Sequence, residues 1–190
     1  MRIVKLAWSY FAQTQPVVIR ALHLIVIAMV ASQFITSDLV DIRHAGEGGR
    51  SLAFAVGTWA HILPGLTLAA IMAIFVIVEL FHRGLKYFFP YLWGDLAQLK
   101  ADVRTLAARK LPEAAPGGLP AIVQGLGLGL LSLTLLSGLT WFLLVRDGSG
   151  WAYGAIELHE ALTSLVVVYV IGHGGMGLLH MALWLRTRRR

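Results

Sequence analysis

The sequence predicts an all-α fold, an integral membrane four-helix bundle with both termini cytoplasmic and a short amphipathic surface helix between spans two and three. Composition is the first reason: hydrophobic residues make up 57% of the 190 residues, charged residues only 14%, and the mean hydropathy is +0.72. A soluble domain of this size is far less apolar. The second reason is four apolar segments that each reach the roughly 20 residues needed to cross a bilayer. The third is the placement of the basic residues.

The four spans are expected at about residues 17–35, 52–80, 121–145 and 155–185. The first segment begins well inside the chain, is too long for the apolar core of a signal peptide and is not followed by a small-residue cleavage site. We therefore expect it to be retained. The sequence shows no repeat and no second domain, so we interpret residues 1–190 as a single transmembrane domain.

Basic residues in short loops indicate the cytoplasmic side of a membrane protein. They lie before or at the start of span one, between spans two and three, and after span four: Arg2, Lys5, Arg20, Arg83, Lys86, Lys100, Arg104, Arg109, Lys110, Arg186, Arg188, Arg189 and Arg190. The other two loops mix signs, with Asp38, Asp41, Arg43, Glu47, Arg50, Arg146, Asp147 and Glu157 in or beside them. Both termini are therefore predicted inside. The positive charge stays at these flanks, so we expect contact with lipid head groups and no nucleic-acid partner.

The connection between spans two and three has its own organisation. It starts with an aromatic cluster of the kind that sits at head-group level: Tyr87, Phe88, Phe89, Tyr91 and Trp93. In residues 95–109, the apolar positions at helical spacing are Leu96, Leu99, Val103 and Leu106, and the polar positions include Lys100, Asp102 and Arg104. This pattern predicts a short helix on the inner membrane surface, ended by PEAAPGG at residues 112–118. A lipid-facing helix is favoured over one that docks a partner.

Histidine is the ionisable residue that the span interiors contain, whereas Asp, Lys and Arg are nearly missing from them. Ionisable side chains inside a bilayer are costly and usually have a specific partner. His23 lies about two turns inside the inner end of span one, and His61 lies about two turns inside the outer end of span two. Span four supplies His159 near its outer end and His173 deeper, towards the inside.

His159 and His173 stand at the two ends of the stretch HEALTSLVVVYVIGH. A helix turns about 100° per residue, so the second ring points within about 40° of the first, roughly 21 Å further along the axis. With both termini inside, spans one and three run outward and spans two and four run inward. His23 and His173 then share an inner level, and His61 and His159 share an outer level. The sequence therefore predicts two pairs of imidazoles, one above the other.

Two neutral imidazoles that face each other without a third protein ligand fit a planar metal macrocycle held axially from both sides. Bare zinc normally needs three or four ligands, and Glu160 lies about 100° around the helix from His159. The chain has no cysteine, which excludes thiolate zinc sites, iron–sulfur clusters and covalent haem attachment through CxxCH. Bis-histidine haem is the better match. For any single histidine, a hydrogen bond to a neighbouring helix is the alternative.

Small residues beside these histidines would let a porphyrin approach the helix backbone. Gly65 lies one turn beyond His61 on the same face, and we assign it, together with Gly172 beside His173, to the cofactor. Three glycines surround His173: Gly172, Gly174 and Gly175. Close packing of membrane helices is another use of glycine. It is an equally good explanation for the three glycines of span three: Gly125, Gly127 and Gly129.

The remaining histidines have simpler interpretations. His44 in an outer loop and His82 at the inner end of span two are expected to be solvated or to contact head groups. His180, about two turns below His173 on the same face, is a candidate for an interfacial contact, a haem propionate partner or part of a quinone pocket. Four arginines near the span ends are candidates to pair with propionates, although each also serves topology: Arg20, Arg50, Arg83 and Arg146.

These motifs resemble those of the prokaryotic cytochrome b561 family. HEALTSLVVVYVIGH followed by GGMGLLHMALW, with His180 and Trp184, is similar to the family's fourth helix. RALH, ending at His23, is similar to its first helix, and HILPG, starting at His61, to its HxxxG second helix. The resemblance covers all four spans, and the wider superfamily includes the cytochrome b subunits of membrane formate dehydrogenases and nickel–iron hydrogenases. The departures are Leu24, where the family often has Trp, and a longer inner loop.

The resemblance implies two haem b groups in a bacterial inner membrane. His23 would pair with His173 at the inner haem, and His61 with His159 at the outer haem. Single electrons would move between a quinone site at one face and a donor or acceptor at the other. A redox partner subunit or a c-type cytochrome is the expected partner, and a homo-oligomer is left open.

Three functions are left open at this point. The first is an electron-transfer module, and the second is a complete enzyme, a stand-alone superoxide oxidase that reduces quinone. The third is a non-haem membrane protein whose histidines bind a transported metal or relay protons. Reduced b-type absorption bands would eliminate the third, and quinone reduction by superoxide with the purified protein alone would separate the first two.

Overall fold

The computed structural model describes residues 9, 12, 15–37 and 52–187. The expectations on the following residues fall outside this part: Arg2, Lys5, Asp38, Asp41, Arg43, His44, Glu47, Arg50, Arg188, Arg189 and Arg190. Within the described part, every regular element is a helix, which confirms the all-α fold.

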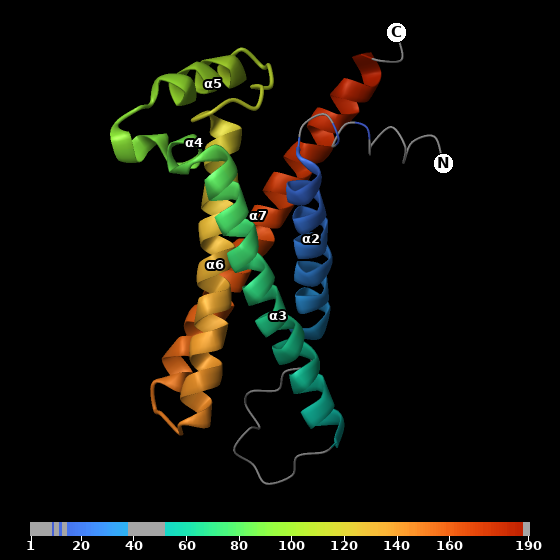
Figure 1. Ribbon diagram of the computed structural model, residues 1–190, viewed down its shortest axis with the longest axis vertical. Helices are drawn as coiled ribbons and strands as arrows, with labels where there is room; N and C mark the ends of the chain where they lie inside the picture. The colour runs from blue at the N-terminus through green and yellow to red at the C-terminus, as the bar shows by residue number, and fades with distance from the viewer. Residues whose placement is uncertain (1–8, 10–11, 13–14, 38–51, 188–190) are drawn as a thin grey trace.

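Four long helices make up the body of the described chain (Figure 1). They are α2 (Val17–Ser37), α3 (Leu52–Arg83), α6 (Leu119–Arg146) and α7 (Ala152–Thr187). Each contains a stretch long and apolar enough to cross a membrane, at Val17–Ser37, Val56–Arg83, Leu119–Arg146 and Ala152–Arg186. The four predicted spans are therefore confirmed. The helices extend a few residues beyond the predicted ends, where sequence patterns place boundaries least reliably.

The long helices pack in pairs, with α2 along α3 and α6 along α7, and the contact of α3 with α6 joins the two pairs. A common apolar core is formed by Ile19, Val26, Val30, Leu68, Met72, Phe75 and Val166. Among the described helices, α2 and α7 are not closely packed backbone to backbone. The space between these two helices is where histidine side chains meet.

The two ends of the bundle differ. Helix α2 begins and α7 ends at the same end, where the connection between α3 and α6 also lies (Figure 1). We call this the connection end; the opposite end, where residues 147–151 join α6 to α7, is the hairpin end. Helices α2 and α6 therefore run from the connection end to the hairpin end, and α3 and α7 run back. This is the up-and-down order that the sequence predicts.

The aromatic segment after α3 folds into α4 (Leu85–Phe88) and η1 (Pro90–Trp93). Phe88 is 1% exposed, so its ring packs inside the protein, while the position of the segment at head-group level stays a prediction. A Cβ at Gly125, at the start of α6, would lie 2.7 Å from Phe88 and 3.0 Å from Phe89. The missing side chain at Gly125 therefore makes the space into which these rings pack, and this glycine serves helix packing.

Helix α5 (Ala97–Ala107) lies across the connection end of the bundle and confirms the predicted helix between spans two and three (Figure 1). Its apolar residues Val103 and Leu106 are exposed, whereas Asp102 is 3% exposed. Asp102 Oδ2 accepts a hydrogen bond of 2.7 Å from the Leu119 backbone N–H. A carboxylate at this position satisfies one of the free N–H groups of the first turn of α6 and complements the helix dipole. The side of α5 that packs against the protein is therefore the one that carries Asp102, and Val103 and Leu106 lie on the exposed side.

Replacing Asp102 with alanine should lower the free energy of unfolding by about 1 kcal/mol, the usual cost of a lost helix N-cap. Thermal unfolding of the purified protein in detergent measures this, and faster proteolysis of α5 should accompany it. Glu113→Ala is the control, because Glu113 is an exposed acid in the same connection. Unfolding of Asp102→Ala at the wild-type temperature would contradict the capping role.

An ion pair closes the segment between α4 and α5. Lys86 Nζ lies 3.1 Å from Asp95 Oδ2. The hydrogen bond from Lys86 lowers the pKa of Asp95 below its usual range. Because both side chains are open to solvent, the pair adds little to the free energy of unfolding.

Candidate functional site

His23 of α2 and His173 of α7 face each other across the space between their helices. The ring centroids are 6.1 Å apart and the ring planes differ by 58°. A metal ion lies about 2 Å from an imidazole nitrogen, which itself lies roughly 1 Å from its ring centre, so two rings on opposite sides of one metal have centroids about 6 Å apart. The observed separation suits one metal atom held axially by both rings. We call these residues the connection-end pair.

An aromatic side chain covers each ring of the connection-end pair. Phe75 of α3 stacks on His23 with centroids 6.1 Å apart and an angle of 23°. Tyr169 stacks on His173 with centroids 5.1 Å apart and an angle of 11°. Tyr169 also lies against Gly127 of α6, so closely that a Cβ there would overlap its ring. These contacts restrict how the two imidazoles can turn.

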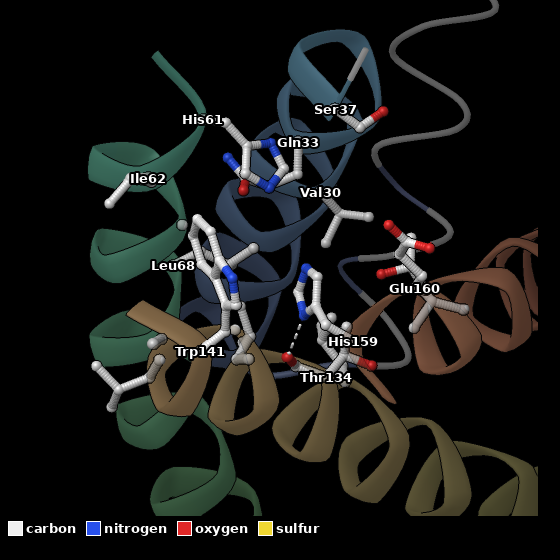
Figure 2. Close-up of a pocket in the computed structure, with 18 of the residues that line it drawn as sticks. Val30, Gln33, Ser37, His61, Ile62, Leu68, Thr134, Trp141, His159 and Glu160 are labelled. Atoms are coloured by element: carbon white, nitrogen blue, oxygen red, sulfur yellow. Dashed lines mark hydrogen bonds between the residues drawn. The ribbon is translucent and has the colours of Figure 1, made fainter. Parts of the chain in front are cut away.

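His61 of α3 and His159 of α7 line a cavity of about 410 Å³ nearer the hairpin end. Figure 2 shows both imidazoles within this cavity. All four long helices contribute to its wall. Its volume falls within the range of roughly 300 to 1,000 Å³ that is usual for small-molecule and cofactor sites. We call these two residues the hairpin-end pair.

Hydrogen bonds decide which ring nitrogen of the hairpin-end pair is available for a ligand. His159 Nδ1 lies 2.9 Å from the Thr134 carbonyl oxygen (dashed in Figure 2), and because that oxygen can only accept, Nδ1–H donates. Thr36 Oγ1 donates to the Ser32 carbonyl at 2.8 Å, so it accepts from His61 Nδ1–H at 3.1 Å. In both residues Nε2 keeps its lone pair, as a metal ligand requires.

The two pairs suit axial ligation of haem better than binding of a bare ion. No group of three His, Asp or Glu side chains among the described residues could hold a metal ion.

The family model described as prokaryotic cytochrome b561 matches residues 14–188, nearly the whole chain. The chain belongs to the prokaryotic cytochrome b561 family. The predicted family is thereby confirmed.

Family membership makes this chain a multi-pass membrane b-type cytochrome of electron transfer, with haem b as its cofactor. Comparisons with the curated proteins and with the solved structures each gave no significant match.

Gly65 of this cytochrome lines the hairpin-end cavity one turn from His61. A Cβ at Gly65 would lie 2.9 Å from Gln33 Oε1, so the glycine leaves room for the Gln33 amide. Gln33 Nε2 is buried and has no hydrogen-bond partner among the described residues. An unpaired buried N–H is costly. The cavity wall therefore includes a donor that can bind an acceptor on an occupant.

Other glycines of this cytochrome b561 family member divide into two groups. Gly138 of α6 supports the hairpin-end pair, because a Cβ there would lie 2.9 Å from His159 Cε1. Gly127 likewise serves packing, under Tyr169. By contrast, a Cβ would meet nothing within 4 Å at Gly129, Gly172, Gly174 and Gly175. The space beside His173 is therefore open, as haem between α2 and α7 would need.

Glu160 requires a correction. Its position about 100° from His159 led us to expect it to point elsewhere, yet it lines the same cavity (Figure 2). The cavity is wide enough to extend along the adjacent face of α7, where Thr163 and Ser164 also line it. A carboxylate thus lies close to the hairpin-end pair.

Arg20 and His180 both lie towards the connection end of the cytochrome. Arg20 is 8% exposed and precedes His23 by three residues, about one turn. His180 Nδ1 lies 2.9 Å from the Met176 carbonyl oxygen, and Nε2 lies 3.2 Å from the Pro112 carbonyl oxygen. Both oxygens only accept, so a neutral ring donates to one of them at a time, and the contact with Pro112 places the ring against the connection. Roles of these residues towards a haem propionate or quinone stay predictions.

Two further arginines of this family member contact other side chains. Arg83 Nε lies 3.0 Å from Glu79 Oε2, and Arg83 Nη1 donates to the Tyr87 hydroxyl at 2.7 Å. Glu79, 6% exposed within a span, is a buried carboxylate that the sequence analysis did not consider. Arg146 lies over the ring of Phe142, 5.7 Å from its centroid. Propionate contacts of both arginines stay predictions.

Sequence reasoning missed the residues that hold the histidines in place: Gln33, Thr36, Phe75, Thr134, Ser137 and Tyr169. A signal existed for Tyr169, which precedes His173 by four residues and so lies one turn away on the same face. The others come from neighbouring helices, and their contacts depend on how the helices are rotated against each other.

Proposed function

We propose that this cytochrome holds two haem b groups in two tiers and transfers electrons across the bilayer between the quinone pool and a redox partner. The observation that carries the proposal is the presence of two opposed histidine pairs at different heights, with α7 contributing to both. The His23–His173 separation suits one axially held iron. The hairpin-end pair offers two available Nε2 atoms across a cavity of suitable volume.

Bound haem would supply one-electron iron chemistry. His23, His173, His61 and His159 would hold the haem groups. Apolar side chains make up most of the wall of the hairpin-end cavity, among them Leu68, Leu131, Leu135 and Val166. Gln33 Nε2 is a donor on the wall of that cavity.

Basic side chains support a cytoplasmic position for the connection end. The described residues there include Arg83, Lys86, Lys100, Arg104, Arg109, Lys110 and Arg186. Positive loops stay on the cytoplasmic side during insertion. In a bacterial inner membrane, the connection-end pair would then hold the inner haem and the hairpin-end pair the outer haem.

Pigment content tests the proposal directly. Purified protein should show reduced b-type absorption bands and about two non-covalent haem b groups per chain by the pyridine haemochrome assay. A colourless preparation after growth with ample haem would contradict the proposal and favour a histidine-based metal or proton transporter.

A second assay separates a carrier from a self-sufficient enzyme. A carrier should reduce or oxidise quinone only after a redox partner, either a membrane-associated subunit or a c-type cytochrome, has been added. Steady quinone reduction by the purified protein with superoxide alone would instead identify a superoxide oxidase.

A further inference from the structure

The two histidine pairs are supported in different ways, and this difference bears on the two haems of the proposed function. In the hairpin-end pair, both rings donate Nδ1–H to oxygen atoms. In the connection-end pair, both rings are covered by aromatic side chains. Iron potential depends on how strongly the axial ligands donate electrons.

The hairpin-end ligands are made more basic by their hydrogen bonds. The Thr134 carbonyl accepts from His159 Nδ1 at 2.9 Å, and Ser137 Oγ lies 3.2 Å from the same nitrogen. Thr36 Oγ1 accepts from His61 Nδ1 at 3.1 Å. An acceptor at the second nitrogen raises ligand basicity. A more basic ligand favours the ferric over the ferrous state.

The connection-end ligands lack this support. Among the described residues, no group hydrogen-bonds a ring nitrogen of His23 or His173; the two rings contact each other, Phe75 and Tyr169. Stacking orients an imidazole but provides no hydrogen-bond acceptor for its N–H group. These ligands are therefore weaker electron donors to iron, which favours the ferrous state.

We propose that Thr36 and the Thr134 carbonyl hold the haem of the hairpin-end pair at a lower reduction potential than the haem of the connection-end pair. Thr36 is then a positioning residue that acts on the iron through His61. Electrons that enter at the hairpin end pass downhill towards the connection end. This inference rests on the proposed function, since it needs haem at both pairs.

A redox titration of the purified di-haem protein tests the assignment, with the b-type bands followed optically. Thr36→Val keeps the shape of the side chain and removes the acceptor at His61. It should raise the lower of the two midpoint potentials and leave the higher one unchanged. A tenfold change in the reduction equilibrium corresponds to about 59 mV for one electron, and we expect a shift of this order.

Two controls accompany this variant. Thr67→Val is matched, because within the described part of the chain Thr67 Oγ1 hydrogen-bonds its own helix at Leu63, and it is exposed; both potentials should stay unchanged. Thr36→Ser retains the hydroxyl and should restore the wild-type value. Where Thr36→Val loses haem, Ser137→Ala tests the same tier from the His159 side and should move the same potential.

The possible outcomes distinguish a failure of this inference from a failure of the proposed function. A shift of the higher potential, no shift in either variant, or a single unresolved wave would overturn the assignment while leaving a di-haem cytochrome. Fewer than two haems in the wild-type protein would overturn the proposed function itself.

Discussion

Replacing His159 with alanine should remove the haem of the hairpin-end pair and lower the haem content of the purified protein to about half. His159 is the histidine that α7 places in this cavity, and its loss would leave His61 as the single candidate ligand there. The chain has no cysteine, so no thioether bond would retain the haem after a histidine ligand is lost. The pyridine haemochrome assay measures the loss, and the spectrum of the connection-end haem should remain.

The matched control for this prediction is His82→Ala. His82 is an exposed histidine in the last turn of α3 and lines neither site. Its replacement should leave the haem content unchanged. Added imidazole should restore part of the lost haem in His159→Ala, since the ligand acts only through its ring. A full complement of low-spin haem in His159→Ala without imidazole would disprove the proposed pairing.

Replacing Gly127 with alanine should destabilise the protein and disturb the haem of the connection-end pair. The new Cβ would overlap the Tyr169 ring, which stacks on His173. Overpacking of a dense interior costs about 1 to 3 kcal/mol. Because Tyr169 must move, we also expect weaker binding of the haem held by His173. Thermal unfolding and haem retention after purification measure the two effects.

Two further variants make this prediction specific. Gly129→Ala is the control, because a Cβ at Gly129 meets nothing within 4 Å, and it should behave as wild type. The double variant Gly127→Ala with Tyr169→Leu should recover stability, since the smaller side chain leaves room for the added methyl. Equal stability of Gly127→Ala and Gly129→Ala would show that the contact with Tyr169 does not limit packing.

Hydropathy and charge were sufficient to predict the four spans, because each long helix must match the thickness of a bilayer and satisfy its own backbone. Helical spacing also predicted α5. It did not predict which side of α5 would be buried. The hydrogen bond of Asp102 to the start of α6 decides that, and it forms between segments that only the folded connection brings together.

The candidate ligands were predictable because position along each span fixes depth, and His23 and His173 indeed meet. The supporting side chains were not, because depth says nothing about rotation of one helix against another. The aromatic pattern also did not show that Phe88 would pack inside the protein, because that contact depends on Gly125 of another helix. Glu160 was expected on a different face of α7 from His159, because the sequence does not show how wide the cavity is.

Helix α7 contributes a histidine to each pair, and this sharing has a consequence for assembly. Filling either site would fix the axial rotation of α7 and so pre-order the ligand that it offers to the other. The second cofactor would then bind with a smaller loss of conformational entropy than the first. Incorporation of the two cofactors should therefore be positively cooperative, with half-loaded chains rare at every level of supply.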